Sequence, residues 1–374
     1  MKIVIDARFT RTDHHDGISR YGASLIAAAS KIADVSMLIS DIRQLALLPD
    51  VPYTLINSPL SPAELFVARR INPLGADVVV CPMQTMGTLG RKYGLVLTLH
   101  DLIYYEHPAP PGFLPAPVRL LWRLYHKAYW PQRLLLNRAD VVATISRTTE
   151  ALMAKYRLTR RPVRIISNAP QPAQEPRSPE AGAKPCLVYM GSFMPYKNVE
   201  TMVAGMAGLP GFTLHLLSRI TPQRRAELEK LVPPGANVEF HNGVTDEEYA
   251  RFLETATALV SLSRAEGYGL PLVEAMALGT PVIASDIPIF REVGGDAASY
   301  VDPASPQQFA DAVKELDDRE RWEDISRRSV ARAREFSWEE SARQLVDVAH
   351  DIVAQRRGKM TQRRGKLTQR RSKL

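Results

Sequence analysis

The sequence predicts an α/β protein with two doubly wound, Rossmann-like domains. Apolar strand-like runs alternate with helical segments twice along the 374 residues, which is enough chain for two hydrophobic cores. Runs such as 77–81 and 94–99 are apolar without alternation, as expected for parallel strands covered by helices on both faces. Between the two series, Ala169–Pro185 contains five prolines and no apolar pattern. We therefore expect domains at 1–170 and 186–337, joined by a linker at 171–185.

The first domain is predicted to begin with a strand and a loop that leads into a helix at Gly17, running to about residue 31. A long helical stretch at 117–137 is expected to kink or break at Pro131, because proline lacks the N–H that a helix interior needs. A further helix is expected between the last two strands. The predicted strands lie at 2–6, 35–39, 53–56, 77–81, 94–99, 141–144 and 163–166.

The second domain repeats the same rhythm. Its predicted strands lie at 186–190, 212–217, 238–240 and 258–262, and its helices at 198–207, 222–231, 246–255 and from 306 to about 355. Ser337 to Glu340 has the pattern of a capping box, which indicates a new helix there. We expect this last helix, 338–354, to pack back on the first domain.

A basic repeat ends the chain. Residues 355–374 repeat the pattern QRRGKMT and contain nine Lys or Arg and no acid, so removing them from the net charge of +8 leaves about −1 for the other 354 residues. One apolar residue in seven is too few for a coiled coil. We predict a disordered tail attracted to anionic lipid. Nucleic acid binding and a passive, solubilising role stay open.

Composition restricts the remaining possibilities. Cys81 and Cys186 lie in separate apolar runs, which indicates neither a disulfide framework nor a metal site. The apolar start of the chain is too short for a signal peptide, and no run reaches the ~20 apolar residues of a membrane span. The aromatic and basic stretch 117–137 is better explained as a half-buried helix than as a membrane-surface helix. We expect a cytoplasmic protein, with peripheral attachment to the inner face of the membrane left open.

The stretch 263–285 carries the strongest functional signal. Glu266 follows an apolar strand, a Gly-Tyr-Gly turn comes next, and Glu274, separated from Glu266 by seven residues, lies inside a predicted helix. Pro271 suits the start of that helix, whose free N–H groups favour anions and hydroxyl groups. Gly267 and Gly269 let a ligand approach the backbone. The two carboxylates can therefore hold two parts of one long ligand.

Other polar residues follow predicted strands. Gly191 and Lys197 lie between a strand and a helix, a pattern that suits a diphosphate. His100 ends a strand and can donate a hydrogen bond to a sugar hydroxyl or a developing charge. Gly17 opens a helix that also carries Arg20. Since ligands bind beyond the carboxyl ends of strands in such sheets, we expect these groups to converge on one cleft between the domains.

Two cofactor types are disfavoured. The first strand is not followed by the G-x-G-x-x-G motif of nicotinamide and flavin sites. Asp13, His14, His15 and Asp16 are adjacent, so they cannot easily converge on one ion. We therefore expect neither a cofactor nor a metal.

These motifs resemble the donor-binding motif of retaining glycosyltransferases with the GT-B fold, family 4, and the resemblance extends from Lys2 to about Val346. It implies that His100 and Glu266 contact the transferred sugar and that Glu274 holds the ribose. It also implies a diphosphate site. The residues that this resemblance assigns to the donor site are Gly17, Gly191, Lys197, Glu274 and the amides of Tyr268, Gly269 and Leu270.

The resemblance has one gap. Many members carry an arginine directly after the glycine of the first loop, where this sequence has Ser192, and some carry one where it has Tyr196. A phosphate-binding cation is therefore either missing or supplied from elsewhere, with Arg264 and Arg219 as candidates. Arg20 is expected on the acceptor side.

The predicted function is a retaining transfer of a hexose from a nucleoside-diphosphate sugar to a hydroxyl of a glycan or lipid-linked acceptor, in surface polysaccharide or glycolipid assembly. His100 with the following Asp-Leu-Ile-Tyr and the Gly191–Lys197 motif look most like bacterial mannosyltransferases, so GDP-mannose is the expected donor. A GT-B epimerase or phosphorylase is the alternative enzyme, although no pyridoxal-lysine motif is recognised. A nucleic-acid-binding protein acting through the tail is the alternative without catalysis. It is disfavoured because a polymer of phosphates needs neither glutamate.

Overall fold

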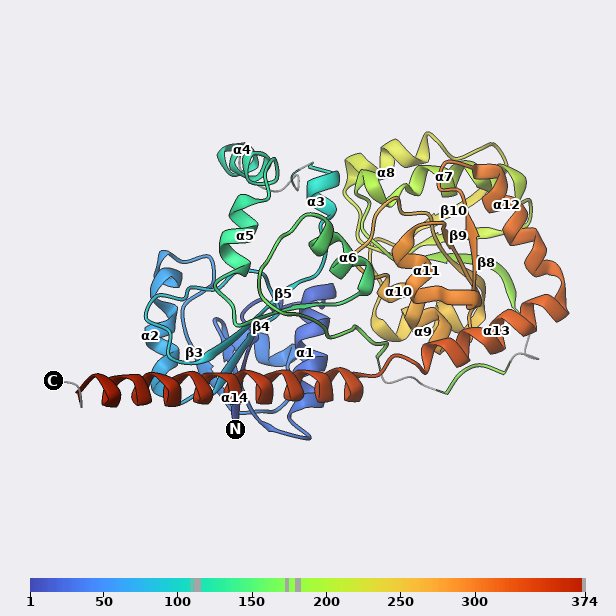
Figure 1. The fold of residues 1–374 in the computed structure, drawn as a ribbon. Coiled ribbons are helices and arrows are strands. Elements are labelled where there is room, and N and C mark those ends of the chain that lie inside the picture. Colours follow the sequence, from blue (N-terminus) through green and yellow to red (C-terminus); the bar gives the residue numbers. More distant parts are fainter. Residues whose placement is uncertain (109, 111–115, 172–174, 179–182, 372–374) are drawn as a thin grey trace. The chain divides into compact units, whose positions relative to one another are not determined.

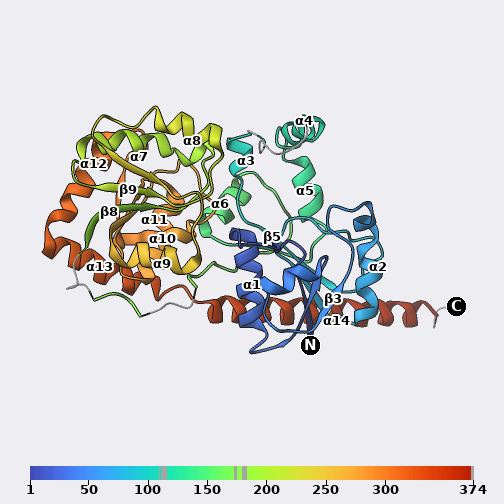
Figure 2. The same cartoon turned by 180° about the vertical axis from the view of Figure 1, so that it is seen from behind.

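The computed structural model describes residues 1–108, 110, 116–171, 175–178 and 183–371, and the chain folds into two compact units (Figures 1 and 2). Unit 1 consists of Met1–Asn168 and Trp338–Leu374, and unit 2 of Ala169–Ser337. Each unit is an α/β domain built on one parallel sheet. This confirms the predicted fold class of two doubly wound domains.

Unit 1 is built on a seven-stranded parallel sheet with the strand order β3-β2-β1-β4-β5-β6-β7. The central strands β4 and β5 are buried along their whole length, which explains their continuous apolar sequence. All seven predicted strands are confirmed to within one residue at each end. Their bounds are β1 (Lys2–Asp6), β2 (Asp34–Ile39), β3 (Tyr53–Leu55), β4 (Val78–Cys81), β5 (Gly94–Leu99), β6 (Val141–Thr144) and β7 (Val163–Ile165).

The helices of unit 1 surround this sheet. The predicted break in 117–137 is confirmed, because α4 ends at Tyr125 and α5 begins at Trp130 with Pro131 in its first turn. The helices are α1 (Gly17–Ala29), α2 (Val67–Ile71), α3 (Ile103–Glu106), α4 (Ala116–Tyr125), α5 (Trp130–Leu136), α6 (Arg147–Lys155) and α14 (Trp338–Arg371).

Unit 2 is built on a six-stranded parallel sheet with the strand order β10-β9-β8-β11-β12-β13. Numbered along the unit, this is the order 3-2-1-4-5-6 of doubly wound nucleotide-binding folds, whose connections reverse direction between β8 and β11. The bounds are β8 (Lys184–Tyr189), β9 (Thr213–Leu216), β10 (Asn237–Phe240), β11 (Ala256–Ser261), β12 (Val282–Ser285) and β13 (Ala298–Val301).

The helices of unit 2 cover both faces of its sheet. Their bounds are α7 (Val199–Gly205), α8 (Pro222–Glu229), α9 (Asp246–Thr255), α10 (Leu270–Ala277), α11 (Pro288–Gly294), α12 (Pro306–Lys314) and α13 (Arg319–Ala333). Helix α9 agrees with its predicted range at both ends, because Thr245 and Glu248 form a capping box at its start. The last two strands and α11 have no counterpart among the predicted elements.

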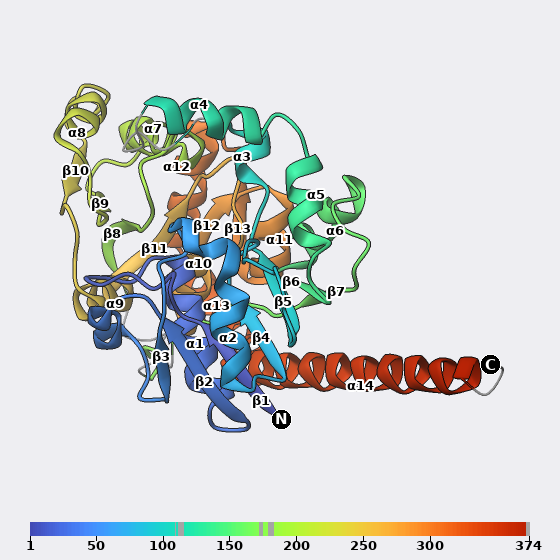
Figure 3. The same ribbon diagram turned by 90° about the vertical axis from the view of Figure 1, so that its left-hand side faces the viewer.

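The long helix α14 includes the described part of the basic repeat, up to Arg371, which corrects the prediction of disorder there. Within unit 1, α14 packs against α1, β4 and β5, and its C-terminal part extends past the sheet (Figure 3). The helix continues to Arg371 because the repeat is rich in Gln, Arg, Lys, Met and Leu, which favour helix, and contains no proline. Its single glycine per repeat costs only ~1 kcal/mol.

Helix α4 corrects a second prediction. The prediction of a half-buried helix at 117–137 agrees with α5, which buries Gln132 and Leu136, but not with α4, in which no residue is buried. Leu121, its most exposed apolar side chain, is 65% exposed, and Leu120 and Leu124 are also exposed. Among the described residues, the structure contains no helix long and apolar enough to cross a bilayer.

The segment expected to be a linker is partly fastened to unit 2. The guanidinium of Arg177 donates to the carbonyl oxygens of Leu253, Glu254 and Ala256 at 3.2, 2.7 and 2.9 Å, and it lies 4.3 Å from the ring centre of Trp322. These contacts link the segment to the end of α9 and the start of β11.

Candidate functional site

The main candidate site lies at the point in unit 2 where the sheet connections reverse. The loop after β8 carries Lys197 and the loop after β11 carries Glu266, and ligands of such sheets bind between two loops of this kind. The Nζ atom of Lys197 lies 2.5 Å from Oε1 of Glu266, and the hydroxyl of Ser263 donates to the same oxygen at 2.8 Å. Both charged side chains are mostly buried, with 15% and 12% exposed.

Asn198 fastens these two loops together. Its backbone is left-handed, with φ 55°, a conformation that asparagine tolerates better than most residues. Its side-chain amide donates to the carbonyl oxygens of Leu262 and Pro303 at 2.9 and 2.6 Å. Lys197 is therefore held beside the strand end that precedes Glu266. Sequence reasoning gave Asn198 no role, although an asparagine directly before a helix is a signal for such a turn.

The pair has a clear chemical capacity. A lysine ammonium is a point charge with three donors, and a carboxylate accepts hydrogen bonds on both oxygens. In this structure the two side chains contact each other directly. A ligand that offers an anion to Lys197 and hydroxyl groups to Glu266 can replace this internal pair by two charge-assisted contacts.

The glycine turn after Glu266 has a backbone that requires glycine. Gly269 has φ 102°, and a Cβ there would lie 2.9 Å from Phe290 Cε1. Helix α10 begins at the next residue, with Pro271 as its second residue rather than its first. Glu274, half-exposed, lies about one turn further along the helix.

The side chain of Tyr268, in the middle of the turn, packs into the interior of unit 2. Its side chain is 5% exposed and lies edge-on to Phe336, with ring centres 6.1 Å apart. Burial raises the pKa of Tyr268 far above its ordinary value, so its hydroxyl keeps its proton over the physiological range. The side chain is therefore structural, and the proposed contact belongs to its amide.

Gly191 lies at the end of β8, where a side chain would not fit. A Cβ there would come within 2.7 Å of the hydroxyl oxygen of Tyr189. Its amide donates to Oγ of Ser218 at 3.0 Å. Because a serine hydroxyl can rotate away, this amide can exchange its partner for a ligand oxygen.

The two arginines proposed as additional phosphate-binding cations both lie in unit 2. Arg264 is the nearer to Lys197, because its amide donates to the carbonyl of Tyr196 at 2.8 Å and its guanidinium to Oδ1 of Asn198 at 3.3 Å. Arg219 is exposed and packs beside Gly243 in the loop after β10.

His100 follows β5 in unit 1, and its hydrogen bonding corrects its predicted role. Its Nε2 lies 2.7 Å from the carbonyl oxygen of Pro82, which can only accept, so Nε2 carries the proton. Burial lowers the pKa of His100, which keeps the ring neutral near pH 7. Nδ1 is then left with a lone pair. The side chain can therefore accept a hydrogen bond from a ligand hydroxyl, rather than donate one as the sequence suggested.

The start of α1 lies near His100 in unit 1. The ring of Tyr21 on α1 meets the His100 ring edge-on at 5.1 Å, so both elements reach the same end of the sheet. Asp16 caps α1 by accepting from the Ser19 amide at 2.9 Å. Gly17, the first residue of α1, is exposed, and a Cβ there would meet nothing within 4 Å. Arg20 is half-exposed on the same helix.

The adjacent acidic and histidine residues before α1 do not form one cluster. Asp13 pairs with Nδ1 of His14 at 2.9 Å, while Nδ1 of His15 bonds to the hydroxyl of Ser19 at 2.9 Å. Asp16 pairs with Arg11 at 2.7 Å. The side chains thus point to separate partners.

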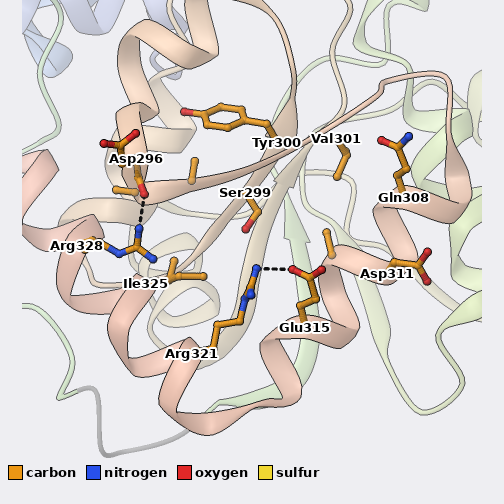
Figure 4. A pocket seen from close by; sticks show the side chains of 13 residues that line it. Asp296, Ser299, Tyr300, Val301, Gln308, Asp311, Glu315, Arg321, Ile325 and Arg328 are labelled. Atoms are coloured by element: carbon orange, nitrogen blue, oxygen red, sulfur yellow. Dashed lines mark hydrogen bonds and ion pairs between the residues drawn. The ribbon is translucent and has the colours of Figure 1, made fainter.

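A separate pocket of about 430 Å³ lies in unit 2 between β13, α12 and α13 (Figure 4). Arg321 bonds to Glu315, and Arg328 donates to the carbonyl oxygen of Asp296 at 2.7 Å. The arginines of this pocket are therefore already engaged. None of the candidate site residues lines it.

Two protein families and several curated proteins are similar to this chain. Residues 170–335 match the family described as "Glycosyl transferases group 1", and residues 33–172 match "Glycosyltransferase Family 4". The O-antigen chain mannosyltransferase RfbU of Salmonella typhimurium is 24% identical over 324 residues, which cover 80% of this chain and 87% of that protein.

Solved structures show the same fold. Sucrose-phosphate synthase from Thermosynechococcus elongatus superposes with a TM-score of 0.73 at 21% identity, over 94% of this chain and 99% of that one. HepE from Anabaena, solved in complex with UDP-glucose, gives a TM-score of 0.69 at 16% identity, over 94% and 100% of the two chains. These structures show that the chain has the GT-B fold, and the two family matches, which together span residues 33–335, show that it is a glycosyltransferase of the group 1 and family 4 type.

Proposed function

We propose that this glycosyltransferase moves a hexose, with mannose as the first candidate, from a nucleoside-diphosphate sugar to a hydroxyl acceptor, with retention of the anomeric configuration. The observation that carries the proposal is the buried pair of Lys197 and Glu266 across the reversal point of the unit 2 sheet. The similarity to an O-antigen chain mannosyltransferase supports mannose and a role in surface polysaccharide assembly, while GDP-mannose as donor and glycolipid as product follow from the resemblance in sequence alone.

Lys197 binds the donor diphosphate in this proposal. When the bond between the sugar and the diphosphate breaks, negative charge grows on the leaving phosphate oxygen. An ammonium held in a mostly buried position stabilises that charge more strongly than one in water. The N-terminus of α10 and the amides of Tyr268, Gly269 and Leu270 add partial positive charge toward the same ligand.

Glu266 holds the transferred sugar. On donor binding, its carboxylate exchanges Lys197 for sugar hydroxyl groups, while the hydroxyl of Ser263 keeps it oriented. Glu274 accepts hydrogen bonds from the ribose hydroxyls. In this proposal, Glu266 binds the sugar end of the donor and Glu274 binds its nucleoside end.

His100 accepts a hydrogen bond from a sugar hydroxyl through Nδ1, because Nε2 is committed to Pro82. We infer a front-face reaction by analogy with the family. The acceptor oxygen bonds to the anomeric carbon, the bond from that carbon to the diphosphate breaks, and the acceptor proton passes to the leaving phosphate oxygen. The product then keeps the donor's configuration.

A calorimetric donor screen tests the proposal. The full chain is titrated with GDP-mannose, UDP-glucose and dTDP-glucose side by side, and the product formed with the preferred donor is examined by NMR. We expect binding of GDP-mannose above the others and a product with the donor's anomeric configuration. Preference for UDP-glucose, the ligand in the HepE structure, would contradict GDP-mannose as the donor. A product with the inverted configuration would contradict the retaining mechanism.

We also propose that the enzyme binds an anionic membrane surface. Helix α4 exposes Leu120, Leu121 and Leu124 beside Arg119 and Arg123, and these are the side chains that a surface-bound helix needs. The nine Lys or Arg of residues 355–374 offer a separate attraction of ~1 kcal/mol each close to such a surface before screening, because the described ones belong to α14, at the end of unit 1 opposite α4 (Figures 1 and 3). An acceptor linked to lipid would then be presented at the same surface.

Liposome sedimentation separates these two contributions. One variant carries Leu120→Ser, Leu121→Ser and Leu124→Ser. A second ends after Gly358, so it keeps Arg356, which donates to the carbonyl oxygen of Lys92 at 2.7 Å. A third, Leu60→Ser, replaces an apolar side chain that is 92% exposed elsewhere in unit 1 and serves as the control.

We expect the truncated chain to lose binding mainly at low salt, where charge attraction is least screened, and the triple variant to lose it at any salt. Both variants should slow transfer to a lipid-linked acceptor and spare a water-soluble analogue. Equal sedimentation of all four proteins would contradict membrane binding through either element.

A further inference from the structure

Three potential metal ligands converge on the edge of the unit 2 sheet, away from the loops described above. His215 lies on β9, Glu239 on the edge strand β10, and His241 directly after β10. Nδ1 of His215 lies 3.0 Å from Nε2 of His241, and Oε2 of Glu239 lies 3.3 and 3.7 Å from these two nitrogens. Among the residues that the structure describes, this is the group of at least three His, Cys or acidic side chains whose ligand atoms all lie within 4.8 Å of one another.

We propose that His215, Glu239 and His241 form a binding site for one Zn²⁺ ion. Zinc binds imidazole nitrogen and carboxylate oxygen at ~2.0–2.2 Å in a tetrahedron, which places neighbouring ligand atoms ~3.3 Å apart. The three observed separations, 3.0, 3.3 and 3.7 Å, lie on both sides of that value. A central ion therefore needs shifts of only a few tenths of an ångström. The fourth position is left for water.

The surrounding packing already orients the two rings. Phe252 on α9 contacts both, with its ring centre 5.0 Å from that of His215 and 4.9 Å from that of His241. The strands are in register, because Glu239 pairs with His215 and the amide of His241 donates to the carbonyl of Leu216 at 3.0 Å. Little side-chain freedom remains to be lost on binding, and this favours affinity.

The ion has a route to the site. Glu239 and His241 also line an open pocket of about 600 Å³ together with Arg225 and Glu229, and the Glu239 side chain is 59% exposed. The positive charge of Arg225 is compensated by Glu229, whose Oε1 lies 2.7 Å from its Nε. An approaching cation therefore does not meet an unpaired arginine there.

Without an ion, the cluster satisfies its own groups incompletely. A neutral imidazole has one N–H, so the contact between the two ring nitrogens uses one proton, and the carboxylate competes for that proton at 3.3 Å. An ion would instead engage all three atoms at once. It would hold together the ends of the neighbouring strands β9 and β10. The loop that contains Ser218 follows β9, and the loop that contains Gly243 follows β10.

Zinc titration of the full chain tests this site, with any purification tag removed and the protein first treated with chelator. Calorimetry should give one Zn²⁺ per chain, and Co²⁺ as a substitute should give the absorption spectrum of a tetrahedral site. Zinc should also raise the melting temperature, because an ion that binds only the folded chain stabilises it. None of these readings depends on enzymatic activity.

The variants identify the ligands. His215→Gln with His241→Gln should weaken zinc binding by at least ~100-fold, beyond the 10–100-fold that loss of an outer partner of a ligand costs. Glu239→Gln, at an exposed side chain, should fold normally and weaken binding by at least ~10-fold. The matched control, His14→Gln with His15→Gln, should bind zinc like the wild type. Equal zinc affinity in the His215/His241 variant, or no stoichiometric binding by the wild type, would overturn the proposal.

Discussion

Glu274 is the residue whose proposed role is easiest to isolate, because it is assigned to the nucleoside end of the donor alone. Glu274→Ala should weaken binding of the free nucleotide by ~1–3 kcal/mol, the scale for leaving a buried polar partner unpaired. Calorimetry with GDP measures this directly.

Glu227 on α8 offers a matched control for that variant. It is exposed and pairs with Arg224 at 3.1 Å, and surface pairs of this kind contribute little. Glu227→Ala should therefore bind GDP like the wild type. If Glu274→Ala also bound GDP with unchanged affinity, its ribose role would be wrong.

His100 gives a prediction about pH. Burial lowers its pKa below the ordinary ~6.5, and only the neutral ring has a lone pair on Nδ1. Turnover should stay level from pH 8 to about 6.5 and fall at lower pH as the ring takes up a proton. His100→Gln should reduce turnover by ~10²-fold or more and lose this pH dependence, while GDP binding persists.

The free energy of unfolding should also fall as the pH is lowered, as turnover does. Below about pH 6.5 the unfolded chain binds a proton at His100 that the folded chain resists, so the free energy of unfolding falls as the pH decreases toward the folded pKa. We expect the free energy of unfolding, measured with urea at several pH values, to change less steeply with pH in His100→Gln than in the wild type. Identical slopes would mean that His100 is not buried as a neutral ring.

At this scale, sequence could name residues but not their partners. Lys197 and Glu266 are predictable, because each follows a strand beside glycines. Their direct contact is not, since it depends on Asn198 bonding to Leu262 and Pro303, residues 64 and 105 positions away. Likewise, only the bond from His100 to Pro82 decides which ring nitrogen faces a ligand.

Among the elements, the turns that open α1 and α10 differ in why they contain glycine. Gly269 has φ 102° and no room for a Cβ, whereas Gly17 has neither constraint. Gly17→Ala should therefore leave the melting temperature unchanged and, if a donor phosphate approaches its amide, lower turnover by ~10-fold or more. Gly269→Ala should lower the melting temperature, because the strain costs ~1–3 kcal/mol.

Thermal melts and initial rates of the two variants distinguish these roles. A Gly17→Ala enzyme with wild-type turnover would show that Gly17 is an ordinary helix-start residue. A Gly269→Ala enzyme as stable as the wild type would show that the turn adapts, although a Cβ there would lie 2.9 Å from Phe290 Cε1.

Two helices show where local sequence rules are insufficient. For the end of α14, charge and repetition suggested disorder, but the repeat's strong helix formers continue a helix already started by packing on α1. For α4, aromatic and basic residues at helical spacing suggested a half-buried face, whereas its leucines are exposed and its two aromatic side chains are only partly buried. Periodicity predicts that a helix forms, but not what covers its apolar face.

For the whole molecule, two parallel sheets were predictable because buried strands are apolar along their length. The missed strands β12 and β13 are short, and β12 lies inside the stretch 263–285, whose residues were assigned to the motif alone. Strand order was not predictable from periodicity. It is this order that places the Lys197 and Glu266 loops next to each other.

The central claim is that Lys197 binds the donor diphosphate and Glu266 the transferred sugar. It is tested most directly by measuring GDP binding and turnover of Lys197→Met and Glu266→Gln. The exposed Lys314→Met serves as the control. Lys197→Met should weaken GDP binding by ~10-fold or more, because it removes a charge-assisted contact to phosphate. Glu266→Gln should bind GDP normally and turn over at least ~10²-fold more slowly. The account would be contradicted if Lys197→Met bound GDP like Lys314→Met, or if Glu266→Gln retained wild-type turnover.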